Sequence, residues 1–147
     1  MALLWVLIAV AAGLANPFQS GANGELNKQV HSPVWAGVWV YASGLLGLLA
    51  FHMFWREAAP AGATLRQVSP WAWAGGLISI ASTMAGLTLA QRMGSGVFTG
   101  VSVTAAVVSS VVLDQMGWLG FKQHTASPMR MVGCALMVAG VWLVSKF

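Results

Sequence analysis

Charge is the scarcest property of this sequence. Its 147 residues include seven Lys and Arg, three Asp and Glu and a single cysteine, so that only 7% of the side chains are charged. A soluble domain carries about 25% charged residues, and this composition cannot cover a water-facing surface. The lone cysteine, Cys134, excludes an intrachain disulfide and a cysteine-based metal site. The net charge of +4 comes without a basic cluster, which argues against nucleic-acid binding. Soluble enzymes, disulfide-stabilised domains and disordered proteins are therefore excluded.

Apolar residues are abundant instead: 58% of the chain is hydrophobic, with 17 glycines and eight tryptophans, as in membrane proteins with closely packed helices. A helix needs about 20 apolar residues to cross the hydrocarbon core. Four stretches meet this requirement, namely 34–55, 71–91, 97–113 and, when extended at both ends, 131–145. Pro33, Pro70 and Pro128 stand at the start of three of these stretches, where proline suits a first helical turn.

The N-terminal stretch from Ala2 to Ala15 is apolar but too short to cross a bilayer. We expect a helix that continues through Pro17, with a kink there, to about Lys28. Asn16, Ser20, Asn23 and Asn27 would share one face of this helix, and a polar face at membrane depth must line a cavity or meet a partner. The alternatives are an interfacial loop from Asn16 onward and a cleaved signal peptide, which the absence of a preceding Lys or Arg disfavours.

The chain is thus predicted to be one all-α membrane domain over 1–147, with five transmembrane helices at approximately 2–28, 33–55, 70–92, 96–115 and 127–146. Alternate loops then lie on opposite sides of the membrane. One side carries Lys28, Arg92 and Lys146, and the other carries Arg56, Arg66, Lys122 and Arg130. Three positive charges on one side against four on the other give no preferred orientation under the positive-inside rule. We therefore expect insertion in both orientations and an antiparallel dimer; the alternative is an orientation set by the N-terminus or by a partner chain.

Several polar and aromatic residues in the spans are candidates for binding a solute. Gln19 and Asn23 could hydrogen-bond the solute directly, or could form hydrogen bonds between helices. Glu25 could bind a cation or exchange protons, although an ion pair with Lys28 is the favoured interpretation. The second span adds a possible aromatic wall and hydroxyls. The predicted substrate-binding residues are Gln19, Asn23, Glu25, Trp39, Tyr41 and Ser43.

Small residues recur at intervals of four in two spans. Gly96, Gly100 and Thr104 form one stripe, and Ser82, Gly86 and Ala90 form another. Such stripes let helix backbones approach closely, so they predict helix packing and a contact between two copies. Asp114 is expected to order the following loop or to pair with Arg130. No enzyme, metal or phosphate-binding signature is present, and we predict neither catalysis nor a cofactor nor a bound metal.

The run from Gly94 to Leu143 contains "LDQMGWLG" followed by "SPMRMVGCALMVAGVWLV", and the upstream pieces "NPFQSGANGEL", "HSPVWAGVWVYASGLLG" and "PWAWAGGL" accompany it. Together they resemble the YdcZ-like family of the drug/metabolite transporter superfamily. The resemblance implies a multi-pass exporter of the inner membrane and a five-helix unit equivalent to half of a ten-helix inverted repeat. A second inverted copy, identical or homologous, would complete the pathway. Small relatives use a membrane glutamate in their first helix, for which Glu25 is the nearest candidate here, at a different depth.

The hypothesis from the sequence is a transporter that moves a small organic solute or cation by alternating access, with proton coupling an open option. Its partners are then the solute, the lipid bilayer and a second chain. Two alternatives remain at this point, a dual-topology ion channel and an accessory subunit of a larger membrane complex. A channel needs a continuous polar lining, whereas the polar residues here cluster in the second half of the first helix.

Overall fold

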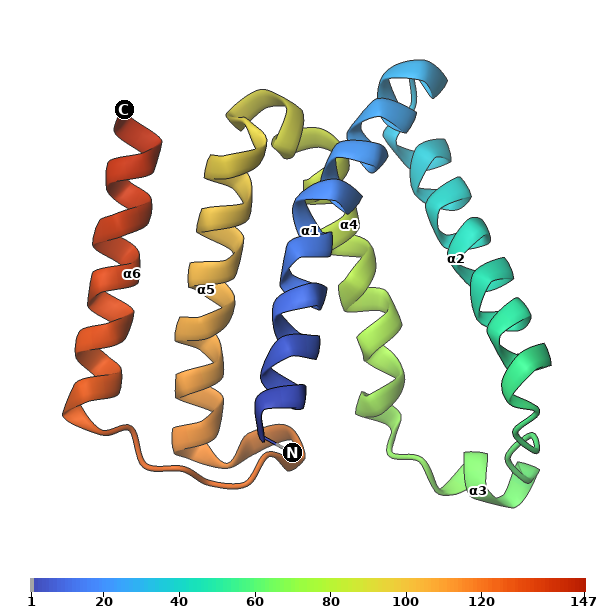
Figure 1. Cartoon of the computed structure of the whole chain (residues 1–147). Helices are drawn as coiled ribbons and strands as arrows, with labels where there is room; N and C mark the ends of the chain where they lie inside the picture. Colours follow the sequence, from blue (N-terminus) through green and yellow to red (C-terminus); the bar gives the residue numbers. More distant parts are fainter. Residues whose placement is uncertain (1) are drawn as a thin grey trace. The chain divides into compact units, whose positions relative to one another are not determined.

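The computed structural model describes residues 2–147, with the backbone alone at Ala2, and all of its regular structure is helical. Five helices in this range are long and apolar enough to cross a membrane, which confirms the predicted all-α fold with five spans. They are α1 (Ala2–Val30), α2 (Pro33–Trp55), α4 (Ala74–Met93) with a preceding 3₁₀ turn η1 (Pro70–Trp73), α5 (Ser95–Met116) and α6 (Pro128–Lys146). Figure 1 shows their order along the chain.

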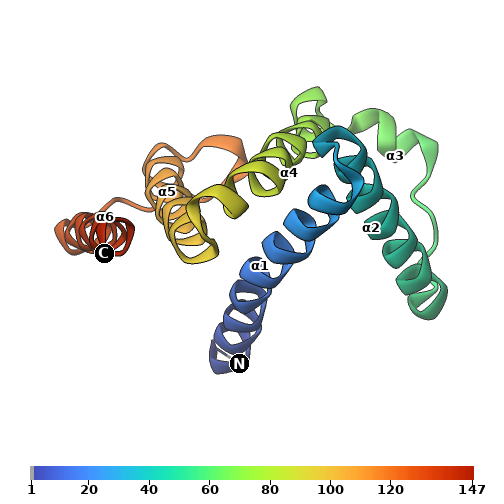
Figure 2. The same cartoon turned by 90° about the horizontal axis from the view of Figure 1, so that it is seen from above.

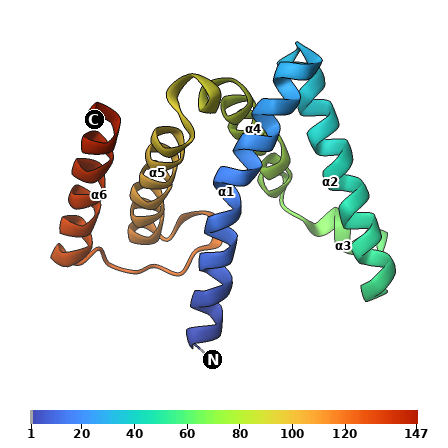
Figure 3. The ribbon, with the colours of Figure 1, turned by 45° about the horizontal axis from the view of Figure 1, so that its top comes forward.

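The first span is one helix through Pro17, so the helix prediction is confirmed over the interfacial loop. The kink expected at Pro17 stays a prediction. The helix ends at Val30, two residues beyond the expected end, and the turn to α2 is shortened to His31 and Ser32 (Figure 3). His31 adopts a left-handed backbone conformation with φ of 54°, which reverses the chain within this short turn.

Proline and serine define where two of the later spans begin. The Ser32 side chain accepts a hydrogen bond from the Trp35 amide at 3.4 Å, and Pro33 occupies the first turn of α2. Ser127 accepts from the Arg130 amide at 3.3 Å in the same way, with Pro128 opening α6. These caps satisfy amide groups that would otherwise lack partners at the helix ends.

The connections contain more helical structure than expected. The predicted loop at 56–69 holds a short helix, α3 (Gly62–Gln67), and the loop at 117–126 holds a 3₁₀ turn, η2 (Trp118–Gly120). Between α4 and α5 only Gly94 lies outside a helix, with φ of +87°, a conformation that glycine adopts without a Cβ clash.

The described chain divides into two compact units. We call the first the α5–α6 unit, which comprises the described residues up to Pro17 together with Arg92–Phe147. The second, the α2–α4 unit, comprises Phe18–Gln91 and includes the C-terminal part of α1. That the whole chain forms a single domain stays a prediction.

In the α5–α6 unit, α5 and α6 lie side by side (Figures 1 and 2). A Cβ at Gly100 would lie 3.2 Å from a methyl group of Val141 on α6, and Thr104, one turn further along α5, is only 7% exposed. Two residues of the first small-residue stripe therefore pack against a helix of the same chain. A Cβ at Gly96 would meet nothing within 4 Å. A contact between two copies through this stripe stays a prediction.

Gly100→Leu is expected to force α5 away from α6 and to destabilise the protein by about 1–3 kcal/mol, the usual cost of overpacking. Gly96→Leu, in the same stripe but facing open space, is the matched control and should change the stability by a few tenths of that amount. Thermal unfolding of the purified chain in detergent measures both. Equal melting temperatures for the two variants would show that Val141 does not oppose Gly100.

Candidate solute site

Three helix segments converge on Leu87 in the α2–α4 unit. Leu87 is fully buried, and its carbonyl oxygen accepts a hydrogen bond from Asn27 Nδ2 of α1 at 2.9 Å. On α2, Gly37 lies against Leu87 and Met84, and a Cβ there would collide with the Met84 methyl group. Gly37 thus leaves room for the end of the Met84 side chain where α2 approaches α4.

Next to this contact, three hydroxyl groups join α2 to α4. The Tyr41 phenol oxygen lies 2.8 Å from Ser79 Oγ and 3.0 Å from Thr83 Oγ1. Ser79 and Thr83 are one turn apart on α4, so both face the same side of that helix. Ser79 Oγ also donates to the Gly76 carbonyl oxygen at 2.7 Å. We call Tyr41, Ser79 and Thr83 the hydroxyl cluster.

The hydroxyl cluster lies well inside both spans. Tyr41 is roughly 12 Å from the start of α2, a helix of roughly 35 Å, and Ser79 and Thr83 flank the centre of the span Pro70–Met93. Tyr41 is nevertheless 39% exposed within the unit, and both of its hydrogen bonds are solvent-accessible. Lipid chains cannot satisfy polar groups at this depth, and polar residues in spans mark pathways or contacts. The cluster is therefore the strongest candidate for a solute site in this unit.

Of the aromatic and hydroxyl residues predicted on α2, only Tyr41 belongs to the cluster. Trp39 and Ser43 are two positions before and after it, about half a helical turn away, so they point to another side of α2. Trp39 is 57% exposed, and Ser43 Oγ donates to the Val40 carbonyl of its own helix at 2.9 Å. The three residues predicted to line one surface of α2 therefore lie on two faces, with Tyr41 on one and Trp39 and Ser43 on the other.

The predicted residues of α1 also separate. Asn23 is half-buried and lies one turn before Asn27, on the side of α1 that meets α4, whereas Gln19 is exposed. Glu25 is exposed; its carboxylate lies 3.8 Å from Lys28 Nζ and accepts from Gln29 Nε2 at 3.0 Å. The predicted ion pair between Glu25 and Lys28 is therefore confirmed.

Ser79 and Thr83 were missed as candidates from the sequence. Their spacing of four residues places two hydroxyls on one helical face, and this was the available signal. The stripe noticed in the same helix was Ser82, Gly86 and Ala90. Gly86 and Ala90 are buried in the α2–α4 unit, in keeping with a packing role, whereas Ser82 is exposed.

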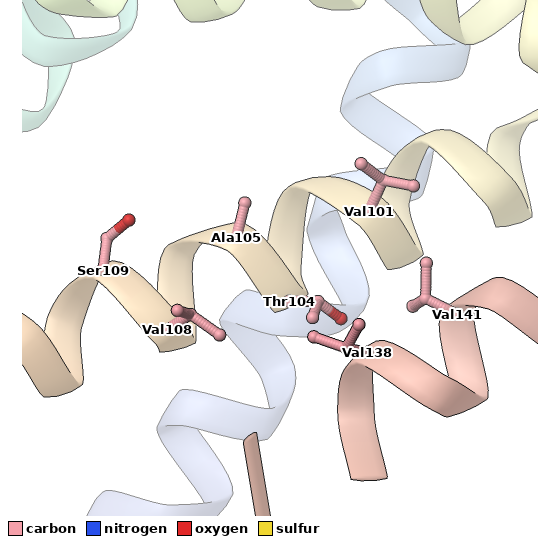
Figure 4. A pocket seen from close by; sticks show the side chains of 7 residues that line it. All are labelled: Val101, Thr104, Ala105, Val108, Ser109, Val138 and Val141. Atoms are coloured by element: carbon pink, nitrogen blue, oxygen red, sulfur yellow. The ribbon is translucent and has the colours of Figure 1, made fainter. Parts of the chain in front are cut away.

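The α5–α6 unit offers a different kind of surface. A groove of about 410 Å³ lies between α5 and α6. Figure 4 shows the side chains that line it. It is lined by Val101, Thr104, Ala105, Val108, Ser109, Val138 and Val141. Most of these side chains are apolar, and Thr104 Oγ1 and Ser109 Oγ are the polar side-chain atoms among them. Such a lining suits a lipid chain or another helix better than a polar solute.

Residues of the "LDQMGWLG" and "SPMR" pieces order the loop between α5 and α6. Arg130 Nη1 lies 3.8 Å from Asp114 Oδ2, which confirms the predicted ion pair. Gln115 Oε1 accepts a hydrogen bond from the Ala126 amide at 2.6 Å, and the His124 amide donates to the Asp114 carbonyl at 2.9 Å. Gly117 ends α5 with φ of +63°. These residues therefore hold the two ends of the loop together.

Five apolar spans and few charges define a multi-pass membrane protein. Residues 4–143 match the family described as "Putative inner membrane exporter, YdcZ" (DMT_YdcZ). The chain belongs to this family, which confirms the resemblance found in the sequence and places the protein in the inner membrane. The family is one of transporters of the drug/metabolite type rather than of enzymes. No curated protein and no solved structure matches the chain.

Proposed function

We propose that the protein exports a small organic solute by alternating access and that the solute binds at the hydroxyl cluster of the α2–α4 unit. The observation that carries this proposal is the accessibility of Tyr41, Ser79 and Thr83 well inside two apolar spans. Their hydroxyl groups bond to one another, and the acceptor lone pairs that remain are available to a solute at a depth where lipid chains offer no hydrogen bond. A discrete cluster of this kind favours a binding site over the continuous polar lining that a channel needs.

Gln19 and Asn23 are proposed to extend this site from α1. Both lie in the α2–α4 unit, and Asn23 is on the side of α1 that meets α4. Neutral amides are less costly to bury than Glu25, whose carboxylate is engaged by Lys28 and Gln29. Trp39 and Ser43 point to another side of α2. They could contact the solute only if residues from outside this unit also bound it there.

Gln19→Leu and Asn23→Leu are each expected to reduce solute transport about tenfold or more, because each removes hydrogen-bonding groups that the solute would use. The measurement is uptake by proteoliposomes, after a screen of amines, amides and organic cations with and without a pH gradient has identified a transported solute. Asn27→Leu serves as the comparison, since the Asn27 amide already donates to Leu87. Loss of folded protein in the Gln19 and Asn23 variants, rather than loss of transport, would assign them to helix packing.

We further propose that two copies assemble in opposite orientations. A five-helix chain corresponds to half of an inverted-repeat transporter, and a second inverted copy would supply the other half. The even distribution of Lys and Arg between the two sets of loops supports insertion in both directions.

Paired reporters fused after Phe147, one active in the cytoplasm and one outside it, are expected to report comparable activity, each within about threefold of the other. The physical reason is that neither side of the chain has a decisive excess of Lys or Arg. Adding two lysines to the loop at Arg56–Ser69 should shift the population strongly to one side. Activity from a single reporter in the unmodified chain would remove the argument for an antiparallel dimer.

A further inference from the structure

The hydrogen bonds of the hydroxyl cluster have a direction, which follows from the number of protons available. A serine hydroxyl has one proton and two acceptor lone pairs. Ser79 Oγ donates its proton to the Gly76 carbonyl oxygen at 2.7 Å. It can therefore only accept at its second contact, so the Tyr41 phenol is the donor in the 2.8 Å hydrogen bond to Ser79.

The same reasoning determines the third bond. Tyr41 has a single hydroxyl proton, which is directed at Ser79, so its 3.0 Å contact with Thr83 requires the Thr83 hydroxyl to donate. The chain of donors runs from Thr83 to Tyr41 to Ser79 to the Gly76 carbonyl. Every hydroxyl proton in the cluster is used. One lone pair remains on Ser79, one on Tyr41 and two on Thr83.

We infer that the hydroxyl cluster selects solutes that donate hydrogen bonds through N–H or O–H groups and discriminates against solutes that can only accept. This inference rests on the proposed function, in that it names the class of solute bound at the proposed site. The cluster offers acceptor lone pairs to a bound solute and no free proton. A carboxylate or a tertiary amide would have to break one of the bonds at 2.7–3.0 Å to obtain a donor.

The inference concerns hydrogen-bond donation and does not depend on the charge of the solute. The acids of the α2–α4 unit are Glu25 and Glu57, and Glu25 is engaged by Lys28 and Gln29. Glu57 follows the end of α2, whereas Tyr41 lies in the first half of that helix. The solute is therefore recognised by neutral hydroxyl oxygens. Both protonated amines and neutral amides can satisfy them through N–H groups.

Two matched pairs of probes separate donation from charge and from aromatic contact. Benzylammonium and benzyltrimethylammonium have the same charge, but only the first has N–H groups. Benzamide and N,N-dimethylbenzamide are both neutral, and again only the first has them. We expect the N–H member of each pair to bind the purified full-length chain about tenfold or more tightly, and benzoate to bind more weakly than benzamide. Calorimetric titration of the chain in lipid nanodiscs, with empty nanodiscs as the blank, measures these affinities.

Tyr41→Phe tests whether the preference arises at the cluster, because phenylalanine keeps the ring but removes the phenol that accepts the Thr83 proton. The freed Thr83 hydroxyl can then donate to a solute, so the preference should fall to about threefold or less in this variant. Thr88→Val is the control; the Thr88 hydroxyl donates to the Met84 carbonyl of its own helix at 2.7 Å and lies outside the cluster. A preference based on solute size alone would survive Tyr41→Phe, and a purely structural role would lower all affinities together. Either result would overturn the inference.

The outcomes also separate this inference from the proposed function. Equal affinities within both pairs, a preference for the methylated members, or no binding of either N–H probe at millimolar concentration would overturn the selection of donors. If Tyr41→Phe abolished transport of another solute found in the proteoliposome screen, the proposed function would stand with a different solute class. If neither the probe affinities nor solute transport responded to Tyr41→Phe, the selection of donors and the proposed solute site would both be wrong.

Discussion

Tyr41→Phe is expected to reduce solute transport about 10-fold to 100-fold while leaving the amount of folded protein unchanged. The phenol oxygen is the centre of the hydroxyl cluster, at 2.8 Å from Ser79 and 3.0 Å from Thr83, and phenylalanine retains the ring while removing both hydrogen bonds. One hydrogen bond to a solute is worth about 1–2 kcal/mol, and the loss of the phenol also frees the Ser79 and Thr83 side chains to rotate.

The measurement is initial uptake by proteoliposomes that contain equal amounts of each variant. Thr88→Val is the control, because it removes a hydroxyl from the same unit without touching the cluster. Polar contacts between membrane helices contribute little on average, so the helical content and melting temperature of Tyr41→Phe should stay close to those of the unmodified chain. Unchanged transport by Tyr41→Phe would exclude the cluster as the solute site.

The second large effect is expected from Leu87→Ala, which should lower the stability of the folded chain by about 2–3 kcal/mol. Leu87 is fully buried where α1, α2 and α4 meet, and its replacement leaves a cavity beside Gly37 and Met84. The estimate is at the low end of the range for soluble cores, since lipid offers Leu87 an apolar environment when the helices separate.

Leu89→Ala is the matched control for this prediction. Leu89 is on the same helix but is 42% exposed, so its truncation opens no enclosed cavity and should cost well under 1 kcal/mol. Thermal or denaturant unfolding in detergent compares the two variants. Similar melting temperatures would indicate that α4 does not contact α1 and α2 through Leu87. Because Tyr41 reaches Ser79 and Thr83 across the same contact, Leu87→Ala should also reduce transport.

The sequence was sufficient for the five spans and for several local features. The long apolar runs and the prolines at 33, 70 and 128 lie close to the observed helix starts. The ion pairs between Glu25 and Lys28 and between Asp114 and Arg130 were also predicted correctly, because the first follows from helical spacing and the second joins the two sides of one loop.

The candidate site was only partly predictable. Tyr41 was singled out on α2, but its partners Ser79 and Thr83 were not, since contacts across 38 and 42 residues depend on how two helices are rotated. Gly100 was noted for its spacing, yet the spacing left open whether the opposing helix belonged to the same chain or to another copy. The structure has α6 of the same chain opposite Gly100, through Val141.

The sequence by itself determined how many helices cross the membrane and, to within about two residues, where each begins and ends. Spanning requires about 20 consecutive apolar residues with all backbone groups bonded within the helix, and both conditions are local. Only the tertiary structure decided which side of each helix meets another. In water an apolar stripe identifies the buried face. Lipid is as apolar as a helix interface, so hydrophobicity does not distinguish the packed side of a span from its lipid side. The facing sides are therefore selected by small residues such as Gly37 and by hydrogen bonds such as those of Tyr41, which take effect only when the helices are together.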